Sequence, residues 1–364
     1  MFDALPRSQS TDAGQTTGGA ITSQPLSRRR FYLTVPTKFA IALIIALSWT
    51  ALSVWLSKRW LDDLAALTSW PFALIAIGFI AYVPGFMNAF MISSLGFDRR
   101  PVRRPLAQYP GITILVAAYN EAAAIRDTLT SLARQDYAGP MQVLVLNDGS
   151  TDETVAIAHS TLVSLSLPAN FDFQVVDFPV NAGKASVLNR GLKMAAHDLV
   201  ATIDGDSWVR IDGVTQIVER LYADPANTVA VAGAVMVRNS RENFLTRAQE
   251  WDYFHGIAAV KRMQSMYHGT LVAQGAFSLY RKEALLEVGG WPECVGEDIV
   301  VSWALLDKGH RIGYAEDALA FTNVPTRIKQ FSLQRKRWSR GLIEAFKAHP
   351  ALLFKRRLTT LFIW

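Results

Sequence analysis

Two long runs of apolar residues near the N-terminus dominate the hydropathy pattern of the chain. Residues 39–56 and residues 70–95 each contain no charged side chain. A helix rises about 1.5 Å per residue, so roughly 20 apolar residues cross the hydrocarbon core of a bilayer. The pattern therefore predicts a transmembrane hairpin over residues 39–97. A cleaved secretory signal is the alternative for the first run, but the run exceeds the ~7–15 residues of a signal core and a second run follows it.

Basic residues flank the outer ends of the hairpin, whereas the short connecting loop holds two basic residues, Lys58 and Arg59, against two acids, Asp62 and Asp63. Those before the first run are Arg28, Arg29, Arg30 and Lys38; those after the second are Arg99, Arg100, Arg103 and Arg104. Because basic flanks stay on the cytoplasmic side, both ends of the hairpin and everything after it are expected in the cytoplasm. Residues 1–38, rich in Ser, Thr, Gly and Gln at their start, are predicted to form a disordered cytoplasmic tail.

After Pro110 the pattern changes to short apolar runs that alternate with helical segments. This alternation predicts an α/β domain with a mostly parallel sheet covered by helices. The expected strands are residues 112–117, 143–146, 174–178, 199–203 and 229–237, with helices at 122–134 and 151–158. Ligands of such sheets bind beyond the carboxyl ends of the strands. Polar residues at those ends are therefore the first candidates for a site.

Composition narrows the possible partners. The pI of about 9.4 permits nucleic-acid binding, but the basic residues follow the membrane flanks, so anionic lipids are the expected partner and nucleic acid is not. Cys294 is the single cysteine, which excludes an intramolecular disulfide. No histidine has metal-ligand spacing to another histidine or to Cys294, which argues against a zinc site.

Asp204-Gly205-Asp206 directly follows an uncharged strand. Two hard oxygen donors two residues apart suit Mg²⁺ or Mn²⁺, which keep coordination positions open for phosphate oxygens. An Asx turn that closes the strand is the alternative for an isolated motif of this kind. The position after a buried strand favours the metal site.

Other strand ends carry groups suited to a nucleotide. Asp148, in Asn-Asp-Gly-Ser, could accept the N–H of a buried uracil, although this sequence is also a common turn. Tyr119 and Glu121 could add a stacking face and a polar contact. Lys184, at a predicted helix start, could contact the nucleotide or could be a solvated lysine.

Glu297 and Asp298 precede an apolar helical run, 299–306. Acids at a helix N-terminus are often only caps and dipole partners. The same dipole keeps a carboxylate ionised, and an ionised carboxylate beside an acceptor hydroxyl can receive its proton. Asp298 is therefore the candidate base for a single displacement with inversion.

Gln334, Arg337 and Trp338 lie at i, i+3 and i+4 of a helix-compatible segment and share one face. An arginine can grip a diphosphate, and a tryptophan can stack on a pyranose ring. A basic amphipathic helix on the membrane surface is the alternative, and it is compatible with the same roles.

In this order the clusters resemble the processive family 2 glycosyltransferases of the GT-A fold, which include cellulose, chitin, hyaluronan, poly-N-acetylglucosamine and nodulation chitooligosaccharide synthases. The resemblance runs from about Pro110 to Gly341. It implies a GT-A catalytic domain at 105–325, a Rossmann-like mixed sheet with flanking helices. It also implies Q-x-x-R-W and interfacial helices at 326–357 and a location in the bacterial inner membrane. The chain ends in an apolar run, 358–364, which looks like the start of a further span and suggests truncation.

The resemblance also implies residue roles. The uridine would be held by Tyr119, Glu121 and Asp148, with Lys184 nearby, and the diphosphate and metal by Asp204 and Asp206. The base would be Asp298, beside Glu297. The acceptor and diphosphate sites would be lined by Gln334, Arg337, Trp338 and Gly275. One departure is Gly296, where many members have threonine. Neither carboxylate that follows it is lost.

These features predict a membrane-bound inverting transferase that extends a β-linked polysaccharide from a UDP-sugar, with N-acetylglucosamine favoured over glucose by resemblance. Transfer of one sugar to a lipid is the alternative reaction. An inactive nucleotide-sugar-binding subunit of an export complex is the alternative class, but it would lack a metal carboxylate or the base. If Trp364 is the true end, two helices cannot enclose a pore for a polymer, and export would need a partner or further copies of the chain.

Overall fold

The computed structural model describes residues 33–267, 269–355 and 358, and the residues from Val35 onward form one compact unit. Residues 1–32 of the predicted tail and nearly all of the predicted span at 358–364 lie outside the described residues. In chain order the elements are α1 (Val35–Leu56), α2 (Lys58–Leu67), α3 (Trp70–Ile77), η1 (Gly78–Tyr82), α4 (Val83–Gly96), β1 (Ile112–Ala118), α5 (Ile125–Ala133), β2 (Met141–Asp148), α6 (Thr154–Ser164), β3 (Phe171–Phe178), α7 (Lys184–Met194), β4 (Leu199–Asp204), β5 (Trp208–Val209), α8 (Gly213–Ala223), β6 (Thr228–Val237), α9 (Phe244–Trp251), η2 (Asp252–Ala259), α10 (Val260–Met266), β7 (Phe277–Arg281), α11 (Lys282–Glu287), α12 (Glu297–Asp307), β8 (Arg311–Thr322), α13 (Ile328–Ala348) and η3 (Pro350–Phe354).

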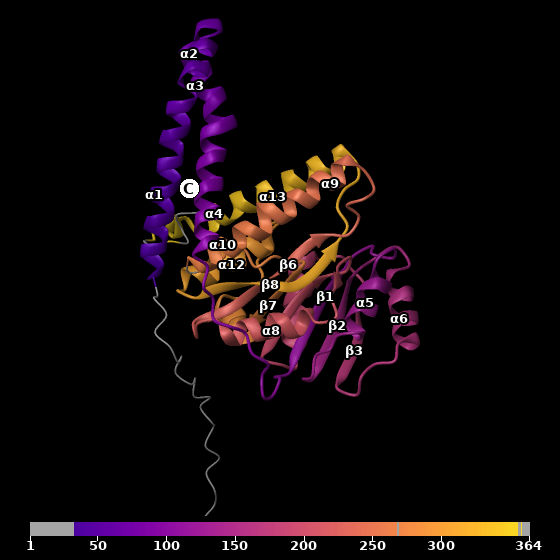
Figure 1. Cartoon of the computed structure of the whole chain (residues 1–364). Coiled ribbons are helices and arrows are strands. Elements are labelled where there is room, and N and C mark those ends of the chain that lie inside the picture. The colour runs from indigo at the N-terminus through magenta and orange to yellow at the C-terminus, as the bar shows by residue number, and fades with distance from the viewer. Residues whose placement is uncertain (1–32, 268, 356–357, 359–364) are drawn as a thin grey trace, which may run out of the picture. The chain divides into compact units, whose positions relative to one another are not determined.

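The two apolar runs form helices that pack side by side, α1 against α4 (Figure 1). Val35–Leu56 and Trp70–Gly96 are both long and apolar enough to cross a membrane. The second is continuous through η1, a π-helical turn that precedes Pro84. Proline has no N–H and its ring clashes with the carbonyl one turn back, which explains the local change of helix type.

Two details of the hairpin differ from the prediction. Residues 35–38, which were assigned to the tail, form the first turn of α1. Pro36 does not prevent this, because the first turn of a helix tolerates proline. The connection that was expected to be a short loop contains the helix α2.

Hydrogen bonds and an ion pair connect the C-terminal end of the hairpin to the part of the chain that carries the sheet. The Tyr267 hydroxyl, at the end of α10, bonds Ser94 of α4 at 2.8 Å. Arg100 donates to the Tyr314 carbonyl at 2.6 Å and to Glu316 at 2.7 Å, both on β8. The second candidate span is thus anchored to α10 and to β8.

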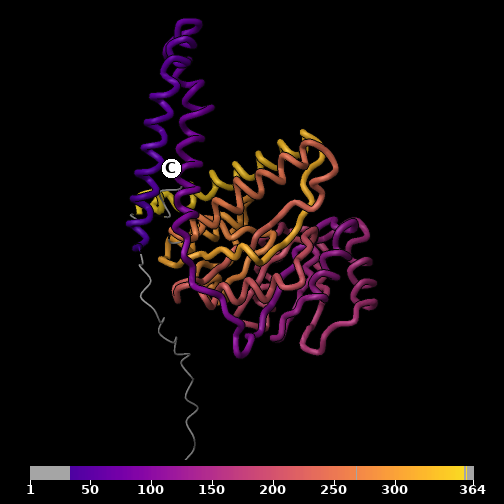
Figure 2. The backbone as a smooth tube through the Cα atoms, viewed as in Figure 1, coloured from indigo at the N-terminus to yellow at the C-terminus, as the bar shows by residue number. Residues whose placement is uncertain are grey.

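The rest of the chain is built on one sheet with the strand order β3-β2-β1-β4-β7-β6-β8-β5. Strands β3, β2, β1 and β4 run parallel, and β6 pairs parallel with β8, while β7 is antiparallel to both β4 and β6 and β5 is antiparallel to β8. The sheet is therefore mixed, as the resemblance to the GT-A fold implies. Helices α5, α6 and α8 cover one face and α7, α11 and α12 the other (Figures 1 and 2).

All five predicted strands are present, each with one to four additional residues at its ends. The predicted helices at 122–134 and 151–158 are also present, and each begins three residues later than expected, at Ile125 and Thr154. Strands β5, β7 and β8 were not predicted. Strands β7 and β8 matter because β7 begins two residues after Gly275 and β8 ends at Thr322, whose hydroxyl bonds Asp206.

Candidate active site

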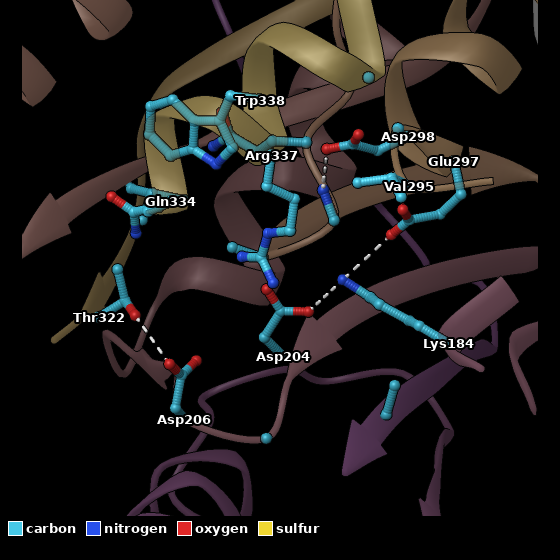
Figure 3. Close-up of a pocket in the computed structure, with 18 of the residues that line it drawn as sticks. Lys184, Asp204, Asp206, Val295, Glu297, Asp298, Thr322, Gln334, Arg337 and Trp338 are labelled. Carbon is cyan, nitrogen blue, oxygen red and sulfur yellow. Dashed lines mark hydrogen bonds and ion pairs between the residues drawn. The ribbon is translucent and has the colours of Figure 1, made fainter. Parts of the chain in front are cut away.

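One cavity of about 850 Å³ opens at the carboxyl ends of the parallel strands. The structure brings every candidate residue of the sequence analysis to its wall: Tyr119, Glu121, Asp148, Lys184, Asp204, Asp206, Gly275, Glu297, Asp298, Gln334, Arg337 and Trp338. Figure 3 shows many of these side chains converging from the sheet edge, α12 and α13. Residues spread over more than half of the chain thus share one space.

Parallel pairing places Asp148 and Asp204, the first acids of the site, at the same edge of the sheet. Because β1 pairs with both β2 and β4, their ends at Ala118, Asp148 and Asp204 lie at one edge of the sheet. The turn after β4 is fixed by the Gly205 N–H, which donates to the Ala117 carbonyl at 3.0 Å. Tyr119, just past β1, is 47% exposed and leaves its ring free to meet a ligand.

Asp148 is buried and already has two backbone partners. Its carboxylate accepts the N–H of Ala182 at 2.7 Å and that of Gly183 at 2.9 Å. These bonds hold the loop in front of α7. Each carboxylate oxygen has a second lone pair, so a ligand N–H can still be accepted.

Lys184, the first residue of α7, joins two of the candidate acids. Its Nζ lies 2.5 Å from Asp204 Oδ1 and 3.4 Å from Glu297 Oε1 (Figure 3). Burial acts to lower the pKa of Lys184, but the carboxylates of Asp204 and Glu297 outweigh it and raise that pKa above its usual range. The lysine is therefore a fixed cation within the cavity and not a solvated side chain.

The other acids of this region carry uncompensated negative charge. Burial, together with the charges of Asp206 and Asp204, raises the pKa of Glu121 to about 7. Burial and the charge of Asp204 also raise the pKa of Asp206, whose partners are the hydroxyls of Thr322 at 3.3 Å and Ser207 at 3.4 Å. A cation at this place would relieve the repulsion.

Within the described ranges no group of three or more His, Cys, Asp and Glu side chains is arranged to hold a metal ion. A nucleotide-bound Mg²⁺ needs fewer protein ligands, because one or two carboxylates are completed by phosphate oxygens and water. The carboxylates of Asp204 and Asp206 fit a metal ion that is bound in this way, together with a nucleotide.

Asp298 is held from two sides at the start of α12. Its Oδ2 accepts the Gly275 N–H at 3.1 Å and its Oδ1 the Ile299 N–H at 2.8 Å (Figure 3). Glu297, one residue earlier, turns instead toward Lys184. The two neighbouring acids therefore face different partners, and Asp298 is the one beside the glycine of the candidate acceptor side.

Helix α13 presents Gln334, Arg337 and Trp338 to the cavity, as their spacing predicted. Figure 3 shows the Arg337 side chain extending toward Asp204. The helix also places exposed apolar side chains outside the cavity: Ile328, Leu333, Leu342 and Ile343. The arrangement agrees with the sequence-based expectation of an amphipathic helix.

Trp338 has a support that sequence reasoning missed. The Arg335 guanidinium lies 4.1 Å from the centroid of the Trp338 ring and 4.9 Å from that of Phe331. Asp252, the first residue of η2, binds Arg335 at 2.7 Å, and the neighbouring Tyr253 packs its ring against Trp338. We call Asp252 and Arg335 the tryptophan clamp. In the sequence, the indication of this contact is that a basic residue, Arg335, lies inside the Q-x-x-R-W segment.

A second residue missed from the sequence is Lys261 of α10. It lines the same cavity and is 8% exposed. In the sequence it is one lysine in an otherwise mixed helix, followed by Arg262, and nothing there separates it from a solvated side chain.

Comparisons with known proteins agree with this geometry. Residues 113–289 match a family model described as glycosyl transferase family 2. A poly-beta-1,6-N-acetyl-D-glucosamine synthase of Staphylococcus aureus is 33% identical over 274 residues, covering 72% of this chain and 64% of that protein. The synthase of the same name from Staphylococcus epidermidis is 34% identical over 264 residues, covering 72% and 62%. This chain thus spans less than two thirds of the length of these relatives.

The fold also has a solved counterpart. A mannosyltransferase from Pyrobaculum calidifontis, in complex with GDP-Man and Mn²⁺, superposes with a TM-score of 0.56 at 19% identity and covers 86% of this chain and 76% of that one. At this identity the likeness concerns the fold, a mixed sheet of GT-A type with flanking helices.

Proposed function

We propose, from the premise that the chain belongs to glycosyl transferase family 2, that it transfers a sugar from a UDP-sugar to a growing β-linked polysaccharide, with inversion at the anomeric carbon. The sugar we propose is N-acetylglucosamine, because the relatives that match 72% of the chain are synthases of a poly-N-acetylglucosamine. The proposal concerns the activity of the whole protein.

One observation carries the proposal. The acids suited to a metal-bound diphosphate, Asp204 and Asp206, and the acid suited to act as base, Asp298, open onto one cavity. An inverting transfer needs these two functions on opposite sides of the same anomeric carbon. A binding module would need only the first.

The donor half of the cavity follows from charge and hydrogen bonding. Tyr119, Glu121 and Asp148 line the part beside β1 and β2, where the uridine would lie, with Asp148 accepting the uracil N–H. Asp204 and Asp206 would hold Mg²⁺ or Mn²⁺, which when bound neutralises the departing diphosphate. Arg337 and Lys184 add positive charge on the same side.

The acceptor half is formed by Asp298, Gly275 and Trp338. The ring of Trp338 offers a stacking surface for a pyranose. Asp298, fixed by the Gly275 N–H, would receive the proton of the acceptor hydroxyl as that oxygen attacks the anomeric carbon. Glu297 keeps Lys184 in place and takes no proton in this scheme.

The membrane arrangement is part of the proposal. The hairpin at 39–97 would span the bacterial inner membrane, the catalytic domain at 105–325 would lie in the cytoplasm, and the segment at 326–357 would lie on the membrane surface. The exposed apolar residues of α13 supply the contact with lipid.

The test is turnover by the full chain, purified in detergent and returned to lipid. We expect UDP release with UDP-N-acetylglucosamine and Mg²⁺ or Mn²⁺, and a product of many sugars. UDP-glucose as the better donor, or one sugar on a lipid, would replace the proposed substrate or product. No release with any UDP-sugar would refute the proposed function.

Asp298→Asn tests the mechanism. We expect transfer to fall about 100-fold or more, as for loss of a general base, while UDP affinity stays unchanged. The matched control is Asp307→Asn at the other end of α12, where the carboxylate pairs with Lys355. Full activity of Asp298→Asn would exclude Asp298 as the base.

A further inference from the structure

Lys261 of α10 has no part in the mechanism described above, although it is buried in the wall of the same cavity. Its ammonium donates to the Val272 carbonyl at 2.9 Å and to the Gln274 side-chain oxygen. Both acceptors are neutral, and no carboxylate of the described residues pairs with it. A buried charge without a counter-ion is costly, and a methionine would fill the same volume without that cost. Packing alone therefore does not explain a lysine here.

The acceptors of Lys261 lead directly to Asp298. Gln274 is held at its other end by its amide, which donates to the Gly233 carbonyl of β6 at 2.8 Å. The next residue is Gly275, whose N–H donates to Asp298. Lys261 thus fixes the segment that fixes the Asp298 carboxylate.

The charge of Lys261 points to the same neighbour. Burial lowers the pKa of Lys261 to about 7, and the negative charge of Asp298, on α12, opposes that shift. The adjacent charge on α10, Arg262, is engaged elsewhere, with Asp98 at 3.0 Å and Glu316 at 3.2 Å. Asp298 is the charged group that acts on Lys261 from the surrounding elements.

We propose that Lys261 is a positioning residue that holds the Asp298 carboxylate in place through Gln274 and Gly275. The inference rests on the proposed function, since it assigns a helper to the base of that reaction. Loss of the link should slow turnover without weakening the binding of the donor nucleotide.

The experiment measures kcat and the donor KM for UDP release by the full chain in lipid. Lys261→Met removes the charge and the bonds at similar volume. We expect kcat to fall roughly tenfold or more with an unchanged donor KM, because the base is displaced while the nucleotide contacts are untouched. Lys261→Arg keeps donors for the Val272 and Gln274 oxygens and should restore part of the lost kcat.

Gln274→Met tests the same link at its other member, because it breaks the bond to Lys261 and leaves the lysine in place. We expect a loss of kcat with an unchanged donor KM. This variant also decides the outcome if Lys261→Met does not fold. The matched control is Lys282→Met, since Lys282 also donates to a carbonyl, that of Ala195 at 2.7 Å, but does not line the cavity.

UDP affinity distinguishes the proposed role from a general structural one. We expect it to stay unchanged in all of these variants. An unchanged kcat in Lys261→Met or in Gln274→Met, or a parallel loss of UDP affinity and kcat, would overturn the inference. Failure of the proposed function is a separate result, because it appears as absent turnover in the unmodified chain.

Discussion

Gly296 and Gly341 pack backbone against backbone where α12 begins and α13 passes. A Cβ placed on Gly296 would lie 2.3 Å from the Gly341 Cα, and one on Gly341 would lie 2.7 Å from the Gly296 Cα. Glu344, one turn after Gly341, accepts the N–H groups of Val295 and Gly296 at 2.9 and 3.0 Å. The helix that carries Trp338 is thus joined to the turn that presents Asp298. The threonine expected from the family resemblance at position 296 does not fit unless α13 moves.

Gly296→Thr should therefore separate the two helices. We expect the free energy of unfolding to fall by about 1–3 kcal/mol, as for overpacked sites, together with a loss of kcat. Thermal unfolding and UDP release measure the two effects. The control is Gly96→Ala, because a Cβ there meets nothing within 4 Å. Unchanged stability and activity of Gly296→Thr would show that the contact is not required.

The tryptophan clamp predicts a defect in acceptor use. Arg335→Lys can keep the ion pair with Asp252 but loses the planar contact with the Trp338 ring. A cation–π contact contributes about 0.5–2 kcal/mol, so we expect the acceptor KM to rise about 2- to 30-fold. The donor KM should not change.

A double-mutant cycle checks that the clamp acts as a unit. Asp252→Asn and Arg335→Lys should cost less together than the sum of their separate effects on acceptor KM. Lys336→Gln is the control, because Lys336 is an exposed cation of the same helix. Additive effects would mean that Asp252 and Arg335 act independently.

Asp148 accepts the N–H groups of Ala182 and Gly183, and we expect it also to recognise the uracil base. Asp148→Asn should reduce the preference for UDP over CDP by roughly tenfold, because an amide can donate to the ring nitrogen of cytosine while a carboxylate cannot. Affinities of both nucleotides, measured by calorimetry, give the answer. An equal loss for UDP and CDP would restrict Asp148 to holding the Ala182 and Gly183 loop.

The acids after β4 predict a metal requirement. A chelator should abolish transfer, and added Mn²⁺ or Mg²⁺ should restore it. In Asp206→Asn we expect the metal concentration for half-maximal rate to rise about tenfold or more, which corresponds to about 1.4 kcal/mol or more. Asp127→Asn, at an exposed ion pair with Arg238, serves as the comparison. Full activity after chelation would exclude the metal.

Strands β1, β2 and β4 could be predicted because each contains an uninterrupted run of apolar or small residues. Residues 112–117 and 199–203 contain only apolar or small side chains, and their polar ends mark where the chain leaves the core. Strand β8 was missed because Glu316 and Asp317 interrupt it, where its register with β6 shifts. Both acids pair with arginines from the segment after α4. No local pattern predicts such partners, since they lie about 200 residues away in the chain.

The same limit applies to the site. Acids that follow strands or begin helices could be identified, since their positions in those elements are visible in the sequence. Lys261, Asp252 and Arg335 could not, because each acts on a side chain of another element or a later turn. Gly296 was noted only as a departure from a family pattern, and its reason, the Gly341 backbone, is visible only in three dimensions.

The bond between Tyr267 and Ser94 connects a candidate membrane helix to the candidate base. Tyr267 ends the short helix that also carries Lys261, and Ser94 belongs to the second candidate span. In the arrangement that we propose, a tilt of that span would shift the residue that positions the base. Bilayer thickness, which sets the tilt of a membrane helix, would then control the rate of the proposed sugar addition.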